Sequence, residues 1–210
     1  MTAIPQIDNG KQPLQPLNVV HIPWLPPETP YGNLTLKGMN IIRRLDRVNL
    51  EIARVFSSYV HPKNENFDPR QDLLEHQFYA ESVVYWLRKT ADELIALAYA
   101  IGEWKNGGQW PGKLKVDSIA GLKHDPPSEL KDLFAPHESY LFTLNEVANA
   151  FKHSFGAEYP VVFALALNKN KLSNKSQFYS VSFADLVERF SKLYLPTMQT
   201  IPKLGSNGRR

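Results

Sequence analysis

Apolar residues recur at regular intervals along residues 70–104, the longest periodic stretch of the chain. One set repeats every seven residues, and a second set interleaves at the other position of a helical seam. This spacing predicts one uninterrupted helix of roughly nine turns whose apolar stripe packs inside a bundle. The two sets are Leu73, Ala80, Leu87, Leu94 and Ile101, and Gln77, Val84, Ala91 and Ala98.

A neighbouring face of the same predicted helix is lined with charged and phenolic side chains. In a structural interpretation, Arg88 pairs with Asp92 four residues on and with a carboxylate of another helix, which fixes the register of the bundle. In a functional interpretation, Arg88 converges in space with a histidine further along the chain. The row consists of Glu81, Tyr85, Arg88, Asp92, Ile95 and Tyr99.

Residues 34–59 carry a second long amphipathic pattern, with apolar residues in steps of four and three. Residues 61–68 have the composition of a loop that returns the chain, so the two helices form an antiparallel hairpin. Four arginines lie off the stripe and form either a solvated basic face or one that contacts phosphate. The stripe is Ile41, Leu45, Val48, Ile52, Val55 and Tyr59, and the arginines are Arg43, Arg44, Arg47 and Arg54.

The second half of the chain alternates helix signals with one short β signal. After a glycine-rich break at 107–112, the pattern predicts a short helix at 129–134 and a longer one from about 137 to 154–156. The runs 160–167 and 177–181 favour a β-hairpin, and Ser182 with Asp185 resembles a capping box that opens a last helix, terminated or kinked at Pro196. The fold class is therefore mainly α: an antiparallel helical bundle with a small β-hairpin before the last helix.

The domain organisation that follows is one bundle domain over 33–201, hairpin 160–181 included, between two extensions. Residues 1–32 hold seven of the sixteen prolines and predict an extended arm. Its apolar segment 19–25 is expected to dock on the bundle of its own chain or on a second subunit. Residues 202–210 are expected to be disordered.

Composition narrows the function classes mainly by exclusion. The 210 residues include no cysteine, which excludes a disulfide framework, a thiolate metal site and a cysteine nucleophile. No apolar run approaches ~18–20 residues and residues 1–15 lack a signal-peptide pattern, so we expect a cytoplasmic protein that does not enter the membrane. The net charge of +3 permits an anionic partner. Phosphate-loop and dinucleotide motifs are absent from the sequence, and no cofactor is predicted.

The densest polar cluster ends the helix predicted from about 137. Glu146, Asn149 and His153 share one helical face, and Asn145 and Lys152 share the adjacent one. A histidine near a helix C-terminus is favoured in its protonated form and could serve as general acid on a phosphodiester, with Lys152 or Arg88 balancing the phosphate charge. The alternative is that lysine and histidine stand there because they stabilise helix C-termini.

The segment Asn149-Ala-Phe-Lys-His153, preceded by a long helical hairpin with an arginine and acidic residues, resembles the HEPN superfamily of helical-bundle domains. The resemblance covers residues 34–153 and implies a dimeric, metal-independent ribonuclease of toxin–antitoxin or phage-defence type, or a silent binding module. Asn149 would match the polar residue of the family motif and His153 its histidine. The motif arginine has no counterpart, because Ala148 precedes Asn149, so Lys152 or Arg88 would supply the cation.

These observations leave two function hypotheses. The first is a HEPN-like protein that binds RNA or a nucleotide, with ribonuclease activity through His153, Asn149, Lys152 and Arg88 and a homodimeric state. The second is a non-catalytic module whose apolar arm and bundle face bind a partner protein. A metal site at Asp72 and His76 with nearby Glu75 and Glu81 was weighed against a hydrogen-bonded or exposed His76, and the sequence favours the latter.

Overall fold

The computed structural model of the chain describes residues 4–10, 25–60, 69–152, 162–163, 166–169 and 179–205. The α-helices are α1 (Leu34–Val60), α2 (Pro69–Gly107), α3 (Ser128–Phe134), α4 (Glu138–Lys152) and α5 (Phe183–Thr200), with 3-10 turns at Ala120–Lys123, Ala135–His137 and Ile201–Lys203. The strands are β1 (Val162–Phe163), β2 (Ala166–Lys169) and β3 (Tyr179–Ser182). The mainly helical class is confirmed.

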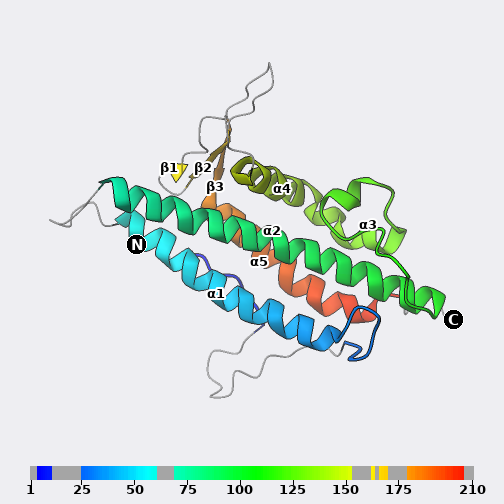
Figure 1. Cartoon of the computed structure of the whole chain (residues 1–210). Helices are drawn as coiled ribbons and strands as arrows, with labels where there is room; N and C mark the ends of the chain where they lie inside the picture. The colour runs from blue at the N-terminus through cyan, green and yellow to red at the C-terminus, as the bar shows by residue number, and fades with distance from the viewer. Residues whose placement is uncertain are drawn as a thin grey trace.

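Helices α1 and α2 form the antiparallel hairpin that the two long periodic patterns predict, and they lie side by side along their length (Figure 1). The predicted stripe of α1 is buried from Ile41 to Val55, and that of α2 from Ala80 to Ile101. Burying apolar side chains from two facing stripes is the main stabilising contribution to such a pair. The side chains of Tyr59 and Leu73 lie outside the described residues.

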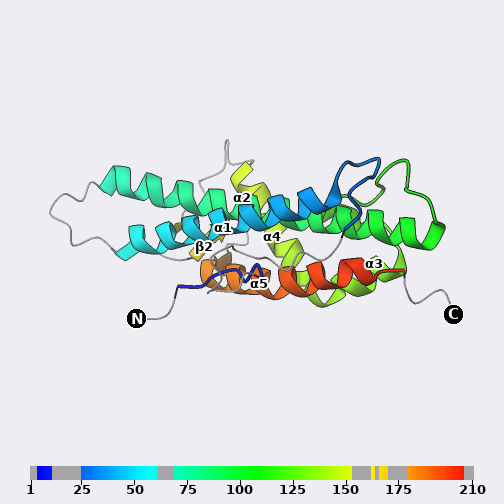
Figure 2. The same ribbon diagram turned by 90° about the horizontal axis from the view of Figure 1, so that it is seen from below.

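Helix α5 forms a second layer beneath the α1–α2 pair, and α4 packs beside it against α2 (Figure 2). The buried phenol of Tyr140 on α4 donates a hydrogen bond of 2.9 Å to the carbonyl oxygen of Leu186 on α5. Burial raises the pKa of this tyrosine well above its ordinary value. The bond therefore holds α4 in one register on α5, and so fixes the side of α4 that faces α2.

The β segment is a three-stranded antiparallel sheet in the order β1-β2-β3. Strands β2 and β3 form the predicted hairpin before the last helix, with Lys169 opposite Tyr179. The prediction of one first strand over 160–167 is wrong in detail, because Val162 pairs with Leu167 and the segment folds back on itself as β1 and β2. An apolar run alone does not reveal such a reversal.

The start of α5 agrees with its predicted cap, whereas its end does not agree with a stop at Pro196. The Ser182 hydroxyl accepts a hydrogen bond from the Asp185 backbone N–H at 3.3 Å, as a helix N-cap does. Pro196 lies inside α5, which continues to Thr200. Of the two predicted alternatives, termination at Pro196 is therefore wrong, and a kink there stays a prediction.

Part of the predicted disordered tail is ordered. Ile201–Lys203 form a 3-10 turn, Leu204 is nearly buried, and the Lys105 ammonium of α2 donates a hydrogen bond to the Pro202 carbonyl. The predicted boundary of the disordered tail at residue 202 is therefore too early. The ordered chain continues to residue 205, because the apolar side chain of Leu204 packs on the end of α2. Residues 206–210 lie outside the described part of the chain.

The described parts of the N-terminal arm lie on the bundle of their own chain. Ile7 is buried, and its backbone N–H donates a 2.8 Å hydrogen bond to the Asn49 side-chain oxygen on α1. The Asp8 N–H donates to the Ser191 hydroxyl on α5 at 2.8 Å, so the segment lies along both helices (Figure 2). Leu25 is also buried in the core, whereas residues 11–24, including most of the predicted apolar segment, lie outside the described residues.

None of the helices in the described ranges combines the length and apolar character that crossing a bilayer requires.

Candidate functional site between α2 and α4

A cleft of about 490 Å³ lies between α2 and α4, and it brings together two of the residues singled out by the sequence. Arg88 reaches it from α2 and Lys152 from the last turn of α4. The two are 64 positions apart in the chain, so their convergence results from the packing of α4 on α2. The remaining lining residues are Phe78, Glu81, Ser82, Val84, Tyr85, Ala148 and Phe151.

The α4 wall of the cleft is built by residues four apart. Ala148 and Lys152 lie one turn from each other on the same face, and the small side chain of Ala148 leaves open space in front of α2. Asn149 is half-buried on α4 and is absent from the cleft lining. His153, the predicted general acid, lies outside the described residues, which end for this helix at Lys152.

Arg88 retains hydrogen-bonding capacity toward the cleft. Its Nε atom lies 3.8 Å from the Asp92 Oδ2 atom, which confirms the predicted i,i+4 ion pair but is too long for a hydrogen bond. This buried Nε–H has no hydrogen-bond partner in the part of the chain that the structure describes. An unsatisfied buried donor is costly in a native protein, and an added acceptor such as a phosphate oxygen would remove that cost.

The carboxylate of Asp92 connects the cleft to the loop after α2. It accepts a hydrogen bond from the Ile119 backbone N–H at 2.8 Å. Burial raises the pKa of Asp92 above 3.8, against the lowering effects of this hydrogen bond and of the nearby Arg88 guanidinium. The Asp92 carboxylate therefore has two contacts: a hydrogen bond to the loop at Ile119 and a longer ion pair with Arg88. The cross-helix carboxylate predicted for Arg88 is not found among the described ion pairs.

The predicted polar row of α2 divides into two parts. Tyr85 is 54% exposed at the cleft, whereas Ile95 and Tyr99, further along, are buried in the core. The row therefore reaches solvent only in the first half of α2, before the helix is covered by the loop and the 3-10 turns that follow it. Sequence periodicity gives the face of a helix but not the place where other segments cover it.

Two aromatic residues of the cleft were not singled out by the sequence. Phe78 is 68% exposed, and Phe151 of α4 is half-buried. Phe78 precedes Tyr85 by seven residues, so the two side chains lie on one line of α2 two turns apart. The seven-residue spacing was the only sign in the sequence that these two rings lie on one face. Aromatic residues at that spacing normally belong to the core, so it did not indicate an exposed pair. Leu74, also 68% exposed, extends this line toward the start of the helix.

The cleft carries both signs of charge. The Glu81 carboxylate accepts a hydrogen bond from the Gln77 side-chain amide at 2.8 Å, which holds it along α2. Lys152 is exposed, and its ammonium group has no ion-pair partner within the described ranges. Lys152 and the partly exposed guanidinium of Arg88, which Asp92 balances in part, are the cationic groups of the cleft lining.

The arginines predicted as a basic face of α1 are mostly paired with carboxylates. Arg44 makes a bidentate pair with Glu93 of α2, with nitrogen–oxygen distances of 2.6 and 3.1 Å. Arg47 and Arg54 both pair with the buried Glu51, at 2.8 and 3.1 Å. The side chains of Arg47 and Arg54 are still 59% and 46% exposed, which agrees with a solvated basic face, whereas Arg44 is 17% exposed and is held across the two helices by Glu93.

The second candidate position, His76, is a buried side chain in a hydrogen bond. Its Nδ1 atom lies 2.8 Å from the Ser58 hydroxyl on α1, so it joins the two long helices. This is the hydrogen-bonded arrangement that the sequence favoured over a metal ligand. Asp72, proposed beside it, has a side chain outside the described residues.

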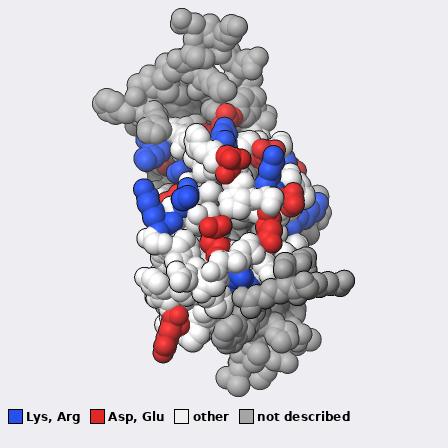
Figure 3. All heavy atoms as spheres, turned by 90° about the vertical axis from the view of Figure 1, so that its right-hand side faces the viewer, with Lys and Arg blue, Asp and Glu red and all other residues white. Residues whose placement is uncertain are grey.

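The charge of +3 is not gathered at the end of the molecule where α2 finishes. On that face, acidic and basic side chains alternate between larger uncharged areas, and neither sign dominates among the described residues (Figure 3). This face therefore offers no broad basic surface to an anion.

No protein-family model, curated protein or solved structure matches this chain.

Proposed function

We propose that the chain binds RNA or a nucleotide in the cleft between α2 and α4. The observation that carries the proposal is that two cations from separate helices, Arg88 and Lys152, line one hollow with two exposed aromatic rings, Phe78 and Tyr85. Single-stranded nucleic acids are typically bound by this combination, in which cations contact phosphate and aromatic rings stack on bases.

Each group has a distinct task in this proposal. The Arg88 guanidinium, on a side chain that is 28% exposed, donates hydrogen bonds to a phosphate oxygen. The Lys152 ammonium, at the mouth of the cleft, neutralises the same or the next phosphate. Phe78 and Tyr85, two turns apart on α2, offer faces for neighbouring bases, and Glu81 accepts from a base amino group or a ribose hydroxyl.

A metal-independent ribonuclease activity extends the same proposal. His153 follows Lys152, the last residue of α4, directly in the sequence, and it is the general acid that the resemblance to HEPN domains implies. In this reaction the ribose 2′ hydroxyl oxygen attacks phosphorus and its proton passes to water. The bond from phosphorus to the 5′ oxygen breaks, His153 protonates that leaving oxygen, and a 2′,3′-cyclic phosphate remains. Arg88 and Lys152 take the place of the absent motif arginine, and Asn149 orients the reacting groups. A homodimer, as the resemblance implies, would place two such helices together.

Binding is tested with the full chain and a fluorescein-labelled single-stranded oligouridylate, measured by fluorescence anisotropy over a range of salt concentrations. Arg88→Gln and Lys152→Gln should each weaken binding by about tenfold and each reduce the salt slope by about one. The matched control is Arg43→Gln, which changes an exposed arginine of α1 outside the cleft. It should leave the affinity and the salt slope unchanged. Equal effects of all three variants would show non-specific charge attraction and contradict the site.

Cleavage is tested by incubating the same RNA with the protein in EDTA and comparing the wild type with His153→Ala. The expected result is cleavage that survives EDTA and is lost in the variant, with RNA binding retained. Equal cleavage by both proteins would remove His153 from the mechanism. Binding without any cleavage would leave the binding proposal intact and contradict only the ribonuclease step.

A second candidate, a protein-interaction module, is favoured by one specific observation. Leu74, Phe78 and Tyr85 are exposed along one line of α2 and form an apolar stripe next to the cleft. Such a stripe suits the apolar face of a partner helix or a second copy of this chain. Phe78→Asp distinguishes the candidates: it should dissociate an assembly seen by light scattering if the stripe is an interface, whereas Phe78→Tyr should preserve RNA binding if the ring stacks on a base.

A further inference from the structure

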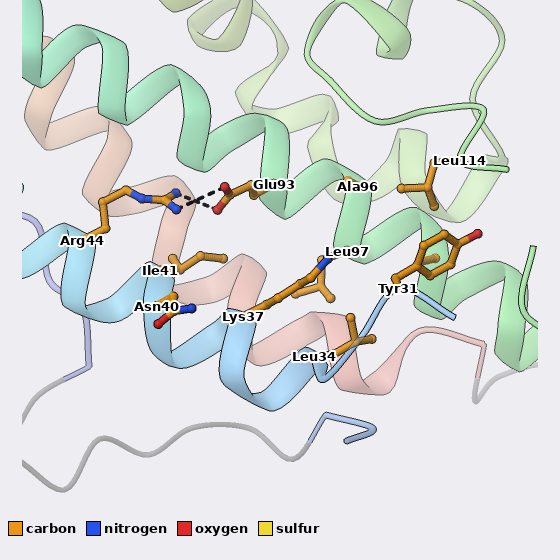
Figure 4. Close-up of a pocket in the computed structure, with 11 residues that line it drawn as sticks. Tyr31, Leu34, Lys37, Asn40, Ile41, Arg44, Glu93, Ala96, Leu97 and Leu114 are labelled. Atoms are coloured by element: carbon orange, nitrogen blue, oxygen red, sulfur yellow. Dashed lines mark hydrogen bonds and ion pairs between the residues drawn. The ribbon is translucent and has the colours of Figure 1, made fainter. Parts of the chain in front are cut away.

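A second hollow, separate from the cleft, lies between α1 and α2. Its volume is about 220 Å³, and none of its lining residues is shared with the α2–α4 cleft. On α2, the nearest lining residues of the two sites are Arg88 of the cleft and Glu93 of the hollow, which are five positions and about 7.5 Å apart along the helix axis. We call this hollow the α1–α2 pocket (Figure 4).

The floor of the α1–α2 pocket is apolar and already buried. Leu34 and Ile41 of α1 and Leu97 and Ala100 of α2 are each at most 6% exposed. The hollow exists because α2 presents the small residues Ala96 and Ala100 toward α1, where larger side chains would fill the space between the helices. Apolar walls of this kind favour an apolar ligand body, because its burial removes further hydrocarbon surface from water.

The frame around the pocket is fixed by several independent contacts. At one end, Arg44 and Glu93 hold each other across α1 and α2 (Figure 4). At the other end, the Tyr31 hydroxyl donates to the Pro111 carbonyl, and the Tyr31 ring meets Trp110 edge-on at 6.4 Å. Trp110 in turn stacks on Trp104 of α2, with ring centroids 4.7 Å apart. The pocket is therefore formed without a ligand, which lowers the entropic cost of binding.

Lys37 is a cation of the pocket lining that has no ion-pair or hydrogen-bond partner for its side chain among the described residues. Lys37 extends from α1 toward Leu97 on α2 (Figure 4), and its ammonium group makes no ion pair or hydrogen bond in the described part of the chain. Arg44 differs, because its charge is balanced by Glu93. Lys89 reaches the same carboxylate at 3.7 Å from outside the pocket. Lys37 therefore supplies the one uncompensated charge among the described lining residues, and it is positive.

We propose that the α1–α2 pocket binds a small organic acid, a monocarboxylate with an aromatic or short aliphatic body. The apolar floor holds the body, and Lys37 pairs with the carboxylate at the rim, where the exposed Asn40 amide adds a hydrogen-bond donor. This proposal does not depend on RNA binding at the α2–α4 cleft.

The experiment titrates the full chain with 2-naphthoate and, separately, with its neutral analogue 2-naphthalenemethanol, using isothermal titration calorimetry. The acid should bind at one site per chain, about tenfold more tightly than the alcohol. Lys37→Gln should remove this preference by weakening the acid about tenfold and leaving the alcohol unchanged. Ala96→Leu, which fills the hollow from a half-exposed position, should abolish binding of both.

The control variant is Arg43→Gln, which removes an exposed charge of α1 that does not line the pocket. It should bind the acid as the wild type does. Absence of saturable binding by the wild type overturns the proposal, as does binding of the acid that persists in Ala96→Leu. Equal binding of acid and alcohol, or the same loss in Arg43→Gln as in Lys37→Gln, overturns the role of Lys37. Far-UV circular dichroism of each variant verifies folding, and the Lys37 comparison stands if Ala96→Leu does not fold.

Discussion

Substitutions of Asp92 test how the loop after α2 is held in place, because one variant removes both contacts of its carboxylate and another removes only the ion pair. Its carboxylate accepts the backbone N–H of Ile119, a residue with no exposed surface, and lies 3.8 Å from Arg88. Asp92→Ala removes both contacts and leaves a buried N–H without an acceptor. Asp92→Asn removes the ion pair but keeps a side-chain oxygen for the N–H.

The expected magnitudes follow from those contacts. An unsatisfied buried N–H costs about 1–3 kcal/mol, whereas a long and partly exposed ion pair contributes about 0–1 kcal/mol. Asp92→Ala should therefore lower the free energy of unfolding by about 1–3 kcal/mol more than Asp92→Asn does. For a chain of this length, this corresponds to roughly 2–12 °C in Tm. Urea denaturation followed by circular dichroism measures the first quantity and thermal melting the second.

The pH dependence of the stability independently checks the direction in which folding shifts the pKa of Asp92. Burial raises the pKa of Asp92 in the folded protein above 3.8, its value in the unfolded chain. The unfolded state therefore loses its proton first, and the stability of the wild type relative to Asp92→Asn should fall as the pH rises from 3.8 through the folded-state pKa, then stay constant. Equal destabilisation by Asn and Ala, or a relative stability that rises over that range, would refute the reasoning.

The remaining predictions concern packing, capping and backbone conformation. Leu94→Ala, at a position with no exposed surface, should cost about 2–5 kcal/mol in urea denaturation, and a loss under 1 kcal/mol would contradict its place in the core. Ser182→Ala should cost about 0.5–2 kcal/mol in the same assay by removing the N-cap of α5, with Ser182→Asp near wild type. Gly205→Ala and Gly108→Ala should each lower Tm, since both glycines have positive φ, of 70° and 71°. Gly205→Ala should have the larger effect, because its Cβ would lie 2.6 Å from the Lys105 Cβ, while nothing lies within 4 Å at Gly108.

The candidate site was only partly predictable. Arg88 and Lys152 could be named because charged residues at regular helical spacing are visible in the sequence. Their convergence could not be derived, because it depends on which face of α4 packs on α2, and the Tyr140–Leu186 hydrogen bond to a third helix helps to set that face. Phe78 was missed because an aromatic residue at helical spacing normally indicates the core, and its exposure depends on what covers the helix. The predicted role of His153 stays a prediction.

The α1–α2 pocket was invisible in the sequence for a related reason. Alanines at positions 96 and 100 fit any helix, and a hollow arises only where two helices with particular side chains face each other. Likewise, Arg44 belongs to a run of basic residues in the sequence, whereas in space it is neutralised by Glu93, which is 49 positions away.

The sequence by itself determined the helical class, the two long helices, the hairpin before α5 and the cap at Ser182, because periodicity and capping are local properties of the chain. Only the tertiary structure decided the reversal between β1 and β2, the passage of α5 through Pro196, the ordered residues 202–205, the neutralised arginines and the two hollows. Each of these depends on contacts between residues distant in the sequence, where packing and charge pairing override local preference.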